Sequence, residues 1–239
     1  MQKVHVLLKK EELDQERLEG KVVIVLDILF ATSTIVTALA HGASEVIPTL
    51  DGKAALAAAQ GRPEGSYVLS GEFNAVTLPG FHHPTPQALL KDGGIEGRTL
   101  IYSTTNGTVA LAKSRDAAHV YAGALLNGEA VVEHVVRTHP ENTVLVVCSG
   151  SADNFNLEDF YGAGYLVSLF RRHDGPRDFT DAALAAELLH AGADAADCLA
   201  RARVGRMMLE RRLDSEIAFA ARKSCYTVVP RLDDGRLVV

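Results

Sequence analysis

The sequence predicts an α/β fold with a largely parallel sheet. Short apolar segments alternate along the chain with alanine- and leucine-rich segments, in the order that strands and crossover helices produce. The apolar segments are continuous runs of Val, Ile and Leu, which indicates strands covered on both faces. The chain has 239 residues, of which 47% are hydrophobic, so it can bury its core as one large domain or as two merged lobes.

Eight segments fit strands, and five segments between them fit helices. The expected strands are VHVLL (4–8), KVVIVLD (21–27), SEVIPTL (44–50), SYVLSGE (66–72), RTLIYST (98–104), AHVYAG (118–123), NTVLVVCSG (142–150) and CYTVVP (225–230). The expected helices are STIVTALAHG (33–42), GKAALAAAQG (52–61), GTVALAKS (107–114), GEAVVEHVVRTH (128–139) and LEDFYGAGYLVSLFRRH (157–173).

The chain changes character over 179–224, where we expect several short helices and no strand. The apolar spacing there, as at Leu184 and Leu188 or Met208 and Leu209, is typical of core packing. The preceding segment FRRHDGPRDFT (170–180) is predicted to be a loop, because Gly175–Pro176 interrupts regular structure.

Composition excludes several classes of function. A formal net charge of −6 argues against a general nucleic-acid or membrane-surface role, although backbone amides can still bind a small anion. The N-terminus turns charged within ten residues, and no run of 18 apolar residues occurs, so neither a signal peptide nor a membrane span is expected. Cys148, Cys198 and Cys225 form no CxxC pair, which suits a reducing cytoplasm.

Four polar clusters follow predicted strands, at the edge where open α/β sheets bind ligands. They are LDILFATST with Asp27, Thr32, Ser33 and Thr34, SGEF with Glu72, STTNGT (103–108), and CSGSADNFNLEDF with Glu158 and Asp159. Each cluster alone has a structural explanation, since hydroxyls cap helices and acids favour a first helical turn. Four clusters at the same kind of position indicate a shared cleft.

The STTNGT cluster fits an anion site. Gly107 lets the backbone approach a ligand closely, and hydroxyls with helix-terminal N–H groups can surround phosphate or carboxylate oxygens. Asp27, Glu72 and Asp159 offer oxygen ligands of the kind that Mg²⁺ prefers. No P-loop is present, because Glu129 and Ala130 stand where Lys and Ser/Thr are needed.

Several of these motifs together resemble the 2-phosphosulfolactate phosphatase (ComB-like) family. The resemblance rests on VVIVLDILFATSTIVTALAHGASEVIP (22–48), TTNGT (104–108) and VVCSGSADNFNLEDFYGAGYLV (146–167), with DSEIAFAARKSCYTVVPRLDDGRL (214–237) at the C-terminal end. It implies a three-layer α/β/α fold and a Mg²⁺-dependent phosphatase that converts (R)-2-phospho-3-sulfolactate to 3-sulfolactate, a step of coenzyme M biosynthesis. It also raises a homodimer as one option.

The resemblance identifies motif positions, and the chemistry of the residues there suggests their roles. Asp27, Glu72 and Asp159 are candidate catalytic residues, as metal ligands or as a general base, and Glu158 is a further candidate metal ligand. The candidate substrate-binding residues of the matched TTNGT motif are Thr104, Thr105, Asn106, Gly107 and Thr108. Thr32 and Ser33, from the cluster that contains Asp27, are added to them.

Two departures from the family pattern leave the substrate open. Phe30 stands where family members usually carry an arginine, whose planar fork grips phosphate or sulfonate. GFHHPTP (80–86) replaces the family's Gly-Phe-Asp-Leu-Gly-Asn-Ser-Pro, so His82 and His83 become candidate substrate-binding residues in place of the lost acid. The alternatives are an enzyme for another small phosphorylated acid, and a catalytically inactive relative that binds an anionic metabolite.

Overall fold

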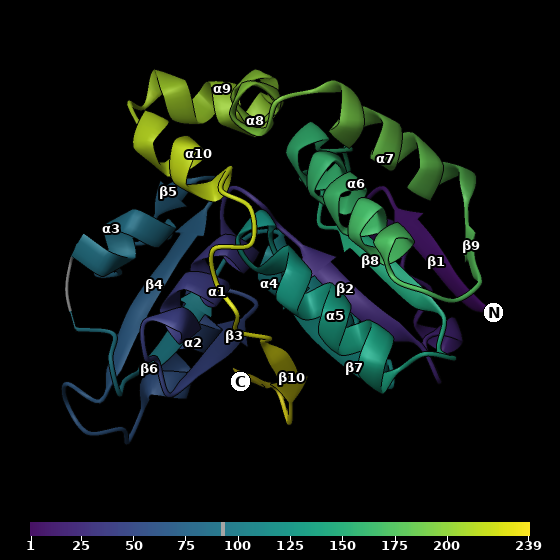
Figure 1. Cartoon of the computed structure of the whole chain (residues 1–239). Coiled ribbons are helices and arrows are strands. Elements are labelled where there is room, and N and C mark those ends of the chain that lie inside the picture. Colours follow the sequence, from purple (N-terminus) through teal and green to yellow (C-terminus); the bar gives the residue numbers. More distant parts are fainter. Residues whose placement is uncertain (92–93) are drawn as a thin grey trace.

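The computed structural model describes residues 1–91 and 94–239, and within them it contains an 11-stranded sheet (Figure 1). The strand order is β5-β4-β6-β3-β11-β10-β7-β2-β8-β1-β9. The strands are β1 Gln2–Leu7, β2 Val22–Leu26, β3 Glu45–Thr49, β4 Tyr67–Phe73, β5 Val76–Thr77, β6 Thr99–Ser103, β7 His119–Gly123, β8 Val144–Cys148, β9 Arg177–Phe179, β10 Arg231–Asp233 and β11 Arg236–Val238.

The helices connect these strands and cover the sheet. They are α1 Ala31–Ala40, α2 Gly52–Ala59, α3 Pro86–Lys91, α4 Gly107–Lys113, α5 Gly128–Thr138, α6 Leu157–Arg172, α7 Asp181–Gly192, α8 Ala195–Arg201, α9 Arg203–Glu210 and α10 Asp214–Ala220. Short 3₁₀ helices lie at Lys10–Glu12, Gln15–Arg17 and Leu125–Asn127. None of the helices in the described part of the chain has the length and apolar character needed to cross a bilayer.

The predicted α/β class is confirmed. Strands β1, β2, β3, β4, β6, β7, β8 and β9 pair in parallel, whereas β5, β10 and β11 pair antiparallel. Alternate residues of β2 enter different cores, which gives three layers. Ile24 packs in the cluster that contains α5 and α6 residues, and Val23 in the cluster that contains α1 and α4 residues. Both faces of β2 are therefore buried, as its continuous apolar run predicted.

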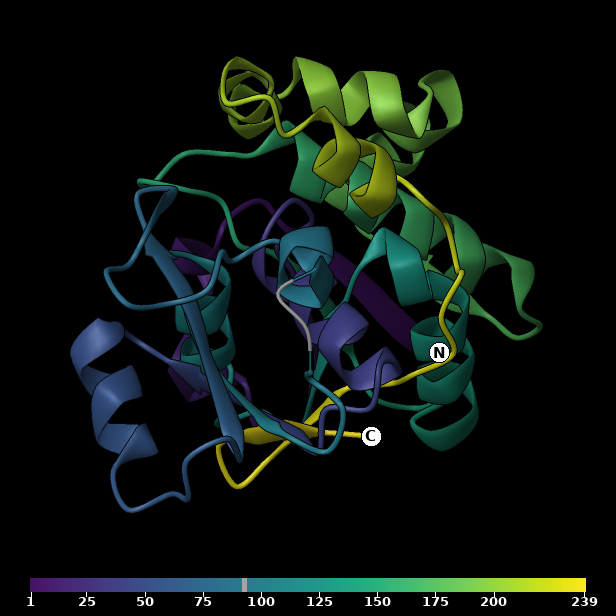
Figure 2. The same cartoon turned by 90° about the vertical axis from the view of Figure 1, so that its left-hand side faces the viewer.

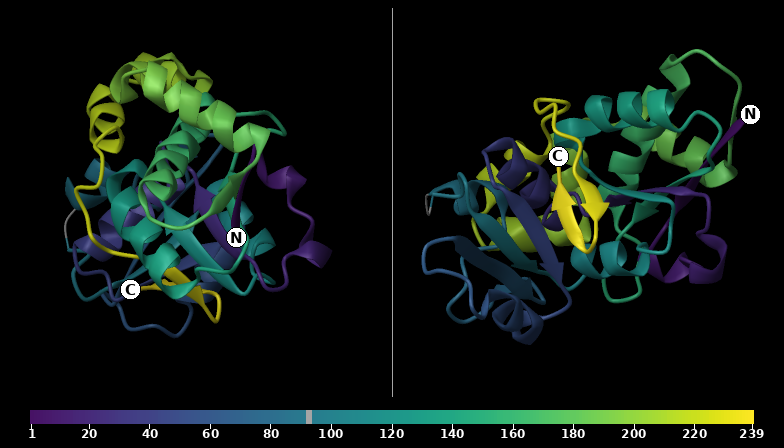
Figure 3. Two further views of the ribbon diagram at one scale, coloured as in Figure 1. Left: turned by 45° about the vertical axis from the view of Figure 1, so that its right-hand side comes forward. Right: turned by 90° about the horizontal axis from the view of Figure 1, so that it is seen from below.

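A C-terminal hairpin fills the middle of the sheet, between a β4-β6-β3 half and a β7-β2-β8-β1 half (Figure 3, right). Arg231 of β10 lies opposite Tyr121 of β7, and Leu237 of β11 lies opposite Val46 of β3. The turn residues Asp234 and Gly235 both have positive φ angles, 44° and 76°, as a two-residue hairpin turn requires.

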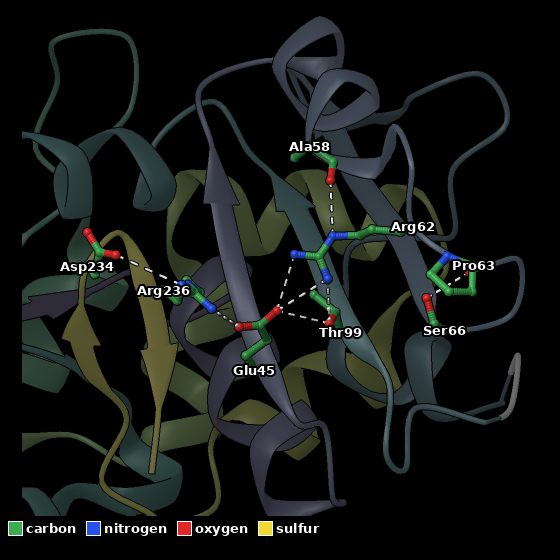
Figure 4. Close-up of polar contacts among 8 residues, drawn as sticks. All are labelled: Glu45, Ala58, Arg62, Pro63, Ser66, Thr99, Asp234 and Arg236. Carbon is green, nitrogen blue, oxygen red and sulfur yellow. Dashed lines mark hydrogen bonds and ion pairs between the residues drawn. The ribbon is translucent and has the colours of Figure 1, made fainter.

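The Glu45 carboxylate at the start of β3 ties the hairpin to this half-sheet (Figure 4). It accepts hydrogen bonds from Arg62 at 3.3 Å, Thr99 at 3.0 Å and Arg236 at 3.2 Å. Burial opposes ionisation of Glu45, but the hydrogen bonds from Arg236 and Thr99 and the nearby positive charges outweigh it and lower its pKa. These charged contacts therefore stabilise the junction between the hairpin and β3, where the backbone pairing of β11 with β3 is short.

Three predicted segments differ from the structure. CYTVVP (225–230) is not a strand but an extended strap, whose Tyr226 N–H donates to the Leu126 carbonyl. FRRHDGPRDFT (170–180) is not wholly a loop, since α6 continues to Arg172 and β9 begins at Arg177 to extend the sheet edge. Glu72 lies within β4 rather than beyond it, because pairing with β5 lengthens β4 to Phe73.

Short helices occupy the region from residue 181 to residue 220, as expected. In Figures 1 and 2, α8, α9 and α10 cross the top of the molecule, at the end of the sheet to which β4 points. Helix α10, near the C-terminus, packs on α3, which lies in the N-terminal half of the chain. This helical layer therefore lies over the edge of the sheet where the polar clusters were predicted.

Candidate active site

A cavity of about 240 Å³ lies where strands β2, β4 and β8 end and the loop after β6 begins. The lining residues come from four strand-end segments and from α9: Asp27, Phe30, Glu72, Asn74, Ala75, Thr105, Asn106, Ser151, Ala152, Asn156, Glu158, Arg203, Val204 and Met207. The shared cleft expected from the four polar clusters therefore exists in the structure, and each cluster contributes to its wall.

Asp27 follows β2 and is held at the first turns of two helices. The backbone N–H groups of Ala31, the first residue of α1, and of Gly107, the first residue of α4, donate to its carboxylate. Gly107 allows this approach, because a Cβ atom there would lie 2.7 Å from Asp27 Oδ2 and 2.3 Å from the Ala31 Cβ. The glycine in TTNGT thus serves to bring its helix against Asp27.

Glu72 of β4 organises two cavity loops. Its Oε1 accepts from the Thr105 N–H at 2.6 Å, and its Oε2 accepts from the Ala75 N–H at 2.6 Å and from Thr105 Oγ1 at 3.1 Å. Both carboxylate oxygens are therefore engaged. Glu72 fixes the TTNGT loop against the β4–β5 turn, which places the Thr105 backbone at the cavity wall.

Glu158 and Asp159 occupy the first turn of α6 and are both buried, but they differ in their partners. Asp159 Oδ1 accepts from the Ile28 N–H at 2.9 Å, and Oδ2 accepts from the Gly150 N–H at 3.1 Å. Asp159 thus joins the loops after β2 and β8. Glu158 lines the cavity, and its Oε2 has no hydrogen-bond partner within the described structure.

The acids perturb one another electrostatically. Burial and the Glu72 carboxylate raise the pKa of Asp27 to about 6, against the Ala31 and Gly107 amides and the Lys10 charge. Burial raises the pKa of Glu158 to about 7, with a further contribution from Asp27. Burial and the two neighbouring acids also raise the pKa of Asp159. Buried acids with raised pKa values are typical of a functional site. Their mutual repulsion destabilises the folded state, and a cation bound in the cavity would relieve it.

Two cations at this edge were missed from the sequence. Arg203 of α9 lines the cavity, hydrogen-bonds to Ser151 and lowers the pKa of Glu158. Lys10 is buried, and its Nζ donates to Asn106 Oδ1 at 3.1 Å and to the Ser149 carbonyl at 3.2 Å. Lys10 lies three residues beyond the end of β1, so its strand-end position was a signal in the sequence, whereas only the folded chain brings Arg203 of α9 to the cavity.

Two tight turns in the cavity wall contain consecutive non-glycine residues with left-handed backbone. Asn74 and Ala75 have φ angles of 51° and 59°, and Ala152 and Asp153 have φ angles of 48° and 58°. L-residues adopt this conformation at an energetic cost, and such costs concentrate at functional sites. The Ala75 turn is held by Glu72 from one side and by Arg211, which donates to the Ala75 carbonyl, from the other.

Several predicted site residues lie behind the cavity wall rather than on its lining. Thr32 Oγ1 accepts from the Asp27 N–H at 2.9 Å, Ser33 donates to the Ile28 carbonyl at 2.6 Å, and the Thr104 and Thr108 hydroxyls bond within their own loop. These buried hydroxyls hold the loops that carry Asp27 and Thr105.

The two candidate histidines lie along β4. The His82 backbone forms a bridge with Ser70, and Ser70 Oγ donates to the His83 carbonyl at 3.0 Å. His83 Nδ1 contacts Thr85 Oγ1 at 2.9 Å. Neither histidine is among the residues that line the cavity.

Phe30, at the position where the family pattern has arginine, lines the cavity together with Val204 and Met207 of α9. It is 9% exposed and belongs to the core cluster that contains α6 residues. One wall of the cavity is therefore apolar where the family pattern has an arginine, and the guanidinium in the cavity comes from Arg203.

A divalent cation in this cavity would need oxygen ligands from its carboxylates. Within residues 1–91 and 94–239, no three His, Cys, Asp or Glu side chains are arranged as a ready metal site. Mg²⁺, however, commonly takes only one or two protein carboxylates and completes its shell with water and phosphate oxygens. Asp27 and the unpartnered Oε2 of Glu158 are compatible with that kind of binding.

Comparisons with known proteins show the family of the chain. Residues 7–235 match the family model described as 2-phosphosulpholactate phosphatase. Proteins named probable 2-phosphosulfolactate phosphatase share 34% identity in Symbiobacterium thermophilum (94% of this chain, 96% of the relative), 33% in Carboxydothermus hydrogenoformans (99% and 97%) and 30% in Clostridium beijerinckii (98% and 98%). The predicted enzyme class, a phosphatase acting on phosphomonoesters, is confirmed at the level of the family. The chain belongs to the 2-phosphosulpholactate phosphatase family.

Proposed function

We propose that the protein is a Mg²⁺-dependent phosphomonoesterase that hydrolyses (R)-2-phospho-3-sulfolactate, or a related small phosphorylated acid, to the hydroxy acid and phosphate. The observation that carries this proposal is the meeting of Asp27, Glu72 and Glu158 with Arg203 around one cavity. The printed names of the relatives support the same reaction class. The absence of a membrane-spanning helix in the described residues and the acidic composition are compatible with a cytoplasmic enzyme.

Asp27 and Glu158 are the residues that would hold Mg²⁺. When bound, the ion neutralises phosphate charge and lowers the pKa of a coordinated water. Glu72 and Asp159 have both carboxylate oxygens engaged by the backbone, so we assign them the positioning of the TTNGT loop and of the loops around Asp27. Asp27, Glu72 and Glu158 line the cavity, whereas Asp159 does not. Asp159 therefore only holds loops, and Glu72 both faces the ligand and holds the TTNGT loop.

The remaining cavity residues would bind and orient the substrate. The Arg203 guanidinium offers paired donors to a carboxylate, sulfonate or phosphate group. Thr105 and Asn106 present polar groups on the opposite loop, and Lys10 fixes Asn106 from behind. Phe30, Val204 and Met207 form an apolar wall that excludes water from the reacting centre.

The proposal is tested by phosphate release from a panel of small phosphorylated acids, including 2-phosphosulfolactate, with Mg²⁺ and with EDTA. We expect release in Mg²⁺ and loss of nearly all of it in EDTA, because the carboxylates alone repel the phosphate dianion. The preferred substrate of the panel identifies the acid. Equal release in EDTA would contradict the metal-dependent reaction.

Replacing Arg203 with glutamine is expected to raise KM for the preferred acid by about ten- to a hundredfold, the loss typical of a charged hydrogen bond. Steady-state kinetics measure it. Arg206→Gln is the matched control, because Arg206 is an exposed residue of the same helix, outside the cavity lining. A normal KM in Arg203→Gln would remove Arg203 from the substrate site.

A second candidate function is a non-catalytic relative that binds an anionic metabolite. Phe30 in the cavity wall favours it, because the arginine of the family pattern is absent there. This alternative predicts ligand binding that persists in EDTA, with no phosphate release from any acid of the panel by folded protein. The Mg²⁺ and EDTA arms of the panel therefore separate the two functions.

A further inference from the structure

A second cavity, of about 520 Å³, lies at the opposite end of the parallel strands. It opens beside His119, the first residue of β7, whereas Asp27 follows the carboxyl end of the neighbouring β2. Its lining residues come from β7, α5, the strap and the C-terminal hairpin: His119, Tyr121, His134, Thr138, His139, Thr227, Val229, Arg231 and Val239. None of the predicted active-site residues is among them.

Tyr121 arranges the histidines of this cavity. Its hydroxyl lies 3.1 Å from His134 Nε2 and 2.7 Å from His139 Nε2. A hydroxyl carries one proton, so it donates to one of these imidazoles and accepts from the N–H of the other. The His119 ring stacks on the His139 ring, with centroids 3.8 Å apart. Three imidazoles are thus fixed in orientation around one buried hydroxyl.

The charges of the lining favour an anion. Arg231 contributes a guanidinium, Thr138 and Thr227 contribute hydroxyls, and the described lining contains no Asp or Glu side chain. Arg231 also contacts Asp233 at 3.4 Å, but both side chains are more than half exposed, so this pair is weak.

We propose that this cavity binds a small tetrahedral oxyanion with two negative charges, such as inorganic phosphate, through Arg231 and the three histidines. The planar guanidinium can bind two oxygens of the anion, and each protonated imidazole can donate to another. The site is separate from the active site, so the proposal does not depend on the enzymatic activity.

Binding should be coupled to protonation of the imidazoles. Burial lowers the pKa of His139 to about 4, helped by the charges of His119 and His134. Burial, Arg137, Arg231 and His119 lower the pKa of His134. A bound dianion favours the charged imidazoles, so affinity should rise as the pH falls from 8 to 6. The charged groups that face these imidazoles from neighbouring elements are Arg137 of α5 and Arg231 of β10. Gln2, which donates to the His139 carbonyl, carries no charge.

The test is isothermal titration calorimetry of the whole chain with sulfate and with inorganic phosphate at pH 6 and pH 8. Sulfate keeps two charges at both values, so any change in its affinity reports on the protein. The titrations are made in an Arg203→Gln background, which removes the guanidinium of the first cavity. We expect one sulfate-binding event that is at least about tenfold tighter at pH 6 than at pH 8. Phosphate gives a smaller change, because it loses its second charge over the same range.

Arg231→Gln in that background should weaken binding by about ten- to a hundredfold. The matched control is Arg236→Gln, in the same hairpin, since Arg236 pairs with Glu45 instead of facing this cavity (Figure 4). His134→Gln, on the half-buried face of α5, gives a second variant if Arg231→Gln unfolds, and it should weaken binding at pH 6 more than at pH 8. Absence of binding at pH 6, or equal affinity in Arg231→Gln and Arg236→Gln, would overturn the proposal.

Discussion

Replacing Asp27 with asparagine is expected to lower phosphate release on the order of a thousandfold or more, while the protein stays folded. Asparagine keeps the shape of the side chain and one oxygen for the Ala31 and Gly107 amides, but it removes the charge that would hold a cation. Phosphate release by the purified variant, at saturating Mg²⁺ and substrate, measures the effect.

The same substitution should raise thermal stability in EDTA at pH 7. The pKa of Asp27 is raised to about 6 in the folded state, so its ionisation destabilises the fold as the pH rises from about 4 to above 6. Asparagine removes that penalty. The control is Asp116→Asn, because the Asp116 side chain is 53% exposed and pairs only with Arg115 at 3.7 Å. A stable Asp27→Asn variant that turns over at the normal rate would show that Asp27 takes no part in the chemistry.

Replacing Gly107 with alanine is expected to lower kcat by about a hundredfold, because displacements of 1 Å in an active site have effects of that order. The new Cβ would meet Ala31 Cβ at 2.3 Å and Asp27 Oδ2 at 2.7 Å, so α4 must move away from Asp27. Overpacking of this kind also costs about 1–3 kcal/mol of unfolding free energy.

Kinetics and urea unfolding of Gly107→Ala measure the two effects together. Gly192→Ala is the matched control, since Gly192 ends α7 with no atom within 4 Å of the added Cβ. Normal activity in Gly107→Ala would mean that the TTNGT glycine is not needed to bring α4 against Asp27.

The strands β2 and β8, which carry part of the site, were predictable because they are buried on both faces and therefore appear as uninterrupted apolar runs. The same rule failed for CYTVVP, whose apolar residues pack on α1 and the Leu125–Asn127 turn without entering the sheet. The true strands β10 and β11 are three residues each and carry charges. The Asp234–Gly235 pair predicts a hairpin turn between them, but strands this short and charged do not show as an apolar pattern.

The site was predictable as a set of strand ends, but not as a division of roles. The sequence analysis treats Glu72 and Asp159 as candidate catalytic residues and Glu158 only as a candidate metal ligand. In the structure, the oxygens of Glu72 and Asp159 are engaged by hydrogen bonds, whereas Oε2 of Glu158 has no partner among the described residues. Arg203 could not be anticipated, because it lies in an arginine-rich helical segment in which only tertiary packing selects the residue that reaches the cavity.

The hairpin between the two half-sheets has a consequence for how the chain folds. β3 and β7 each expose one edge until residues 231–238 arrive, and these residues follow every other strand in the sequence. During synthesis, both halves can therefore form before the strands that join them leave the ribosome. The unpaired edges are sites at which nascent chains can associate, so we expect the final assembly step to be slow and sensitive to protein concentration.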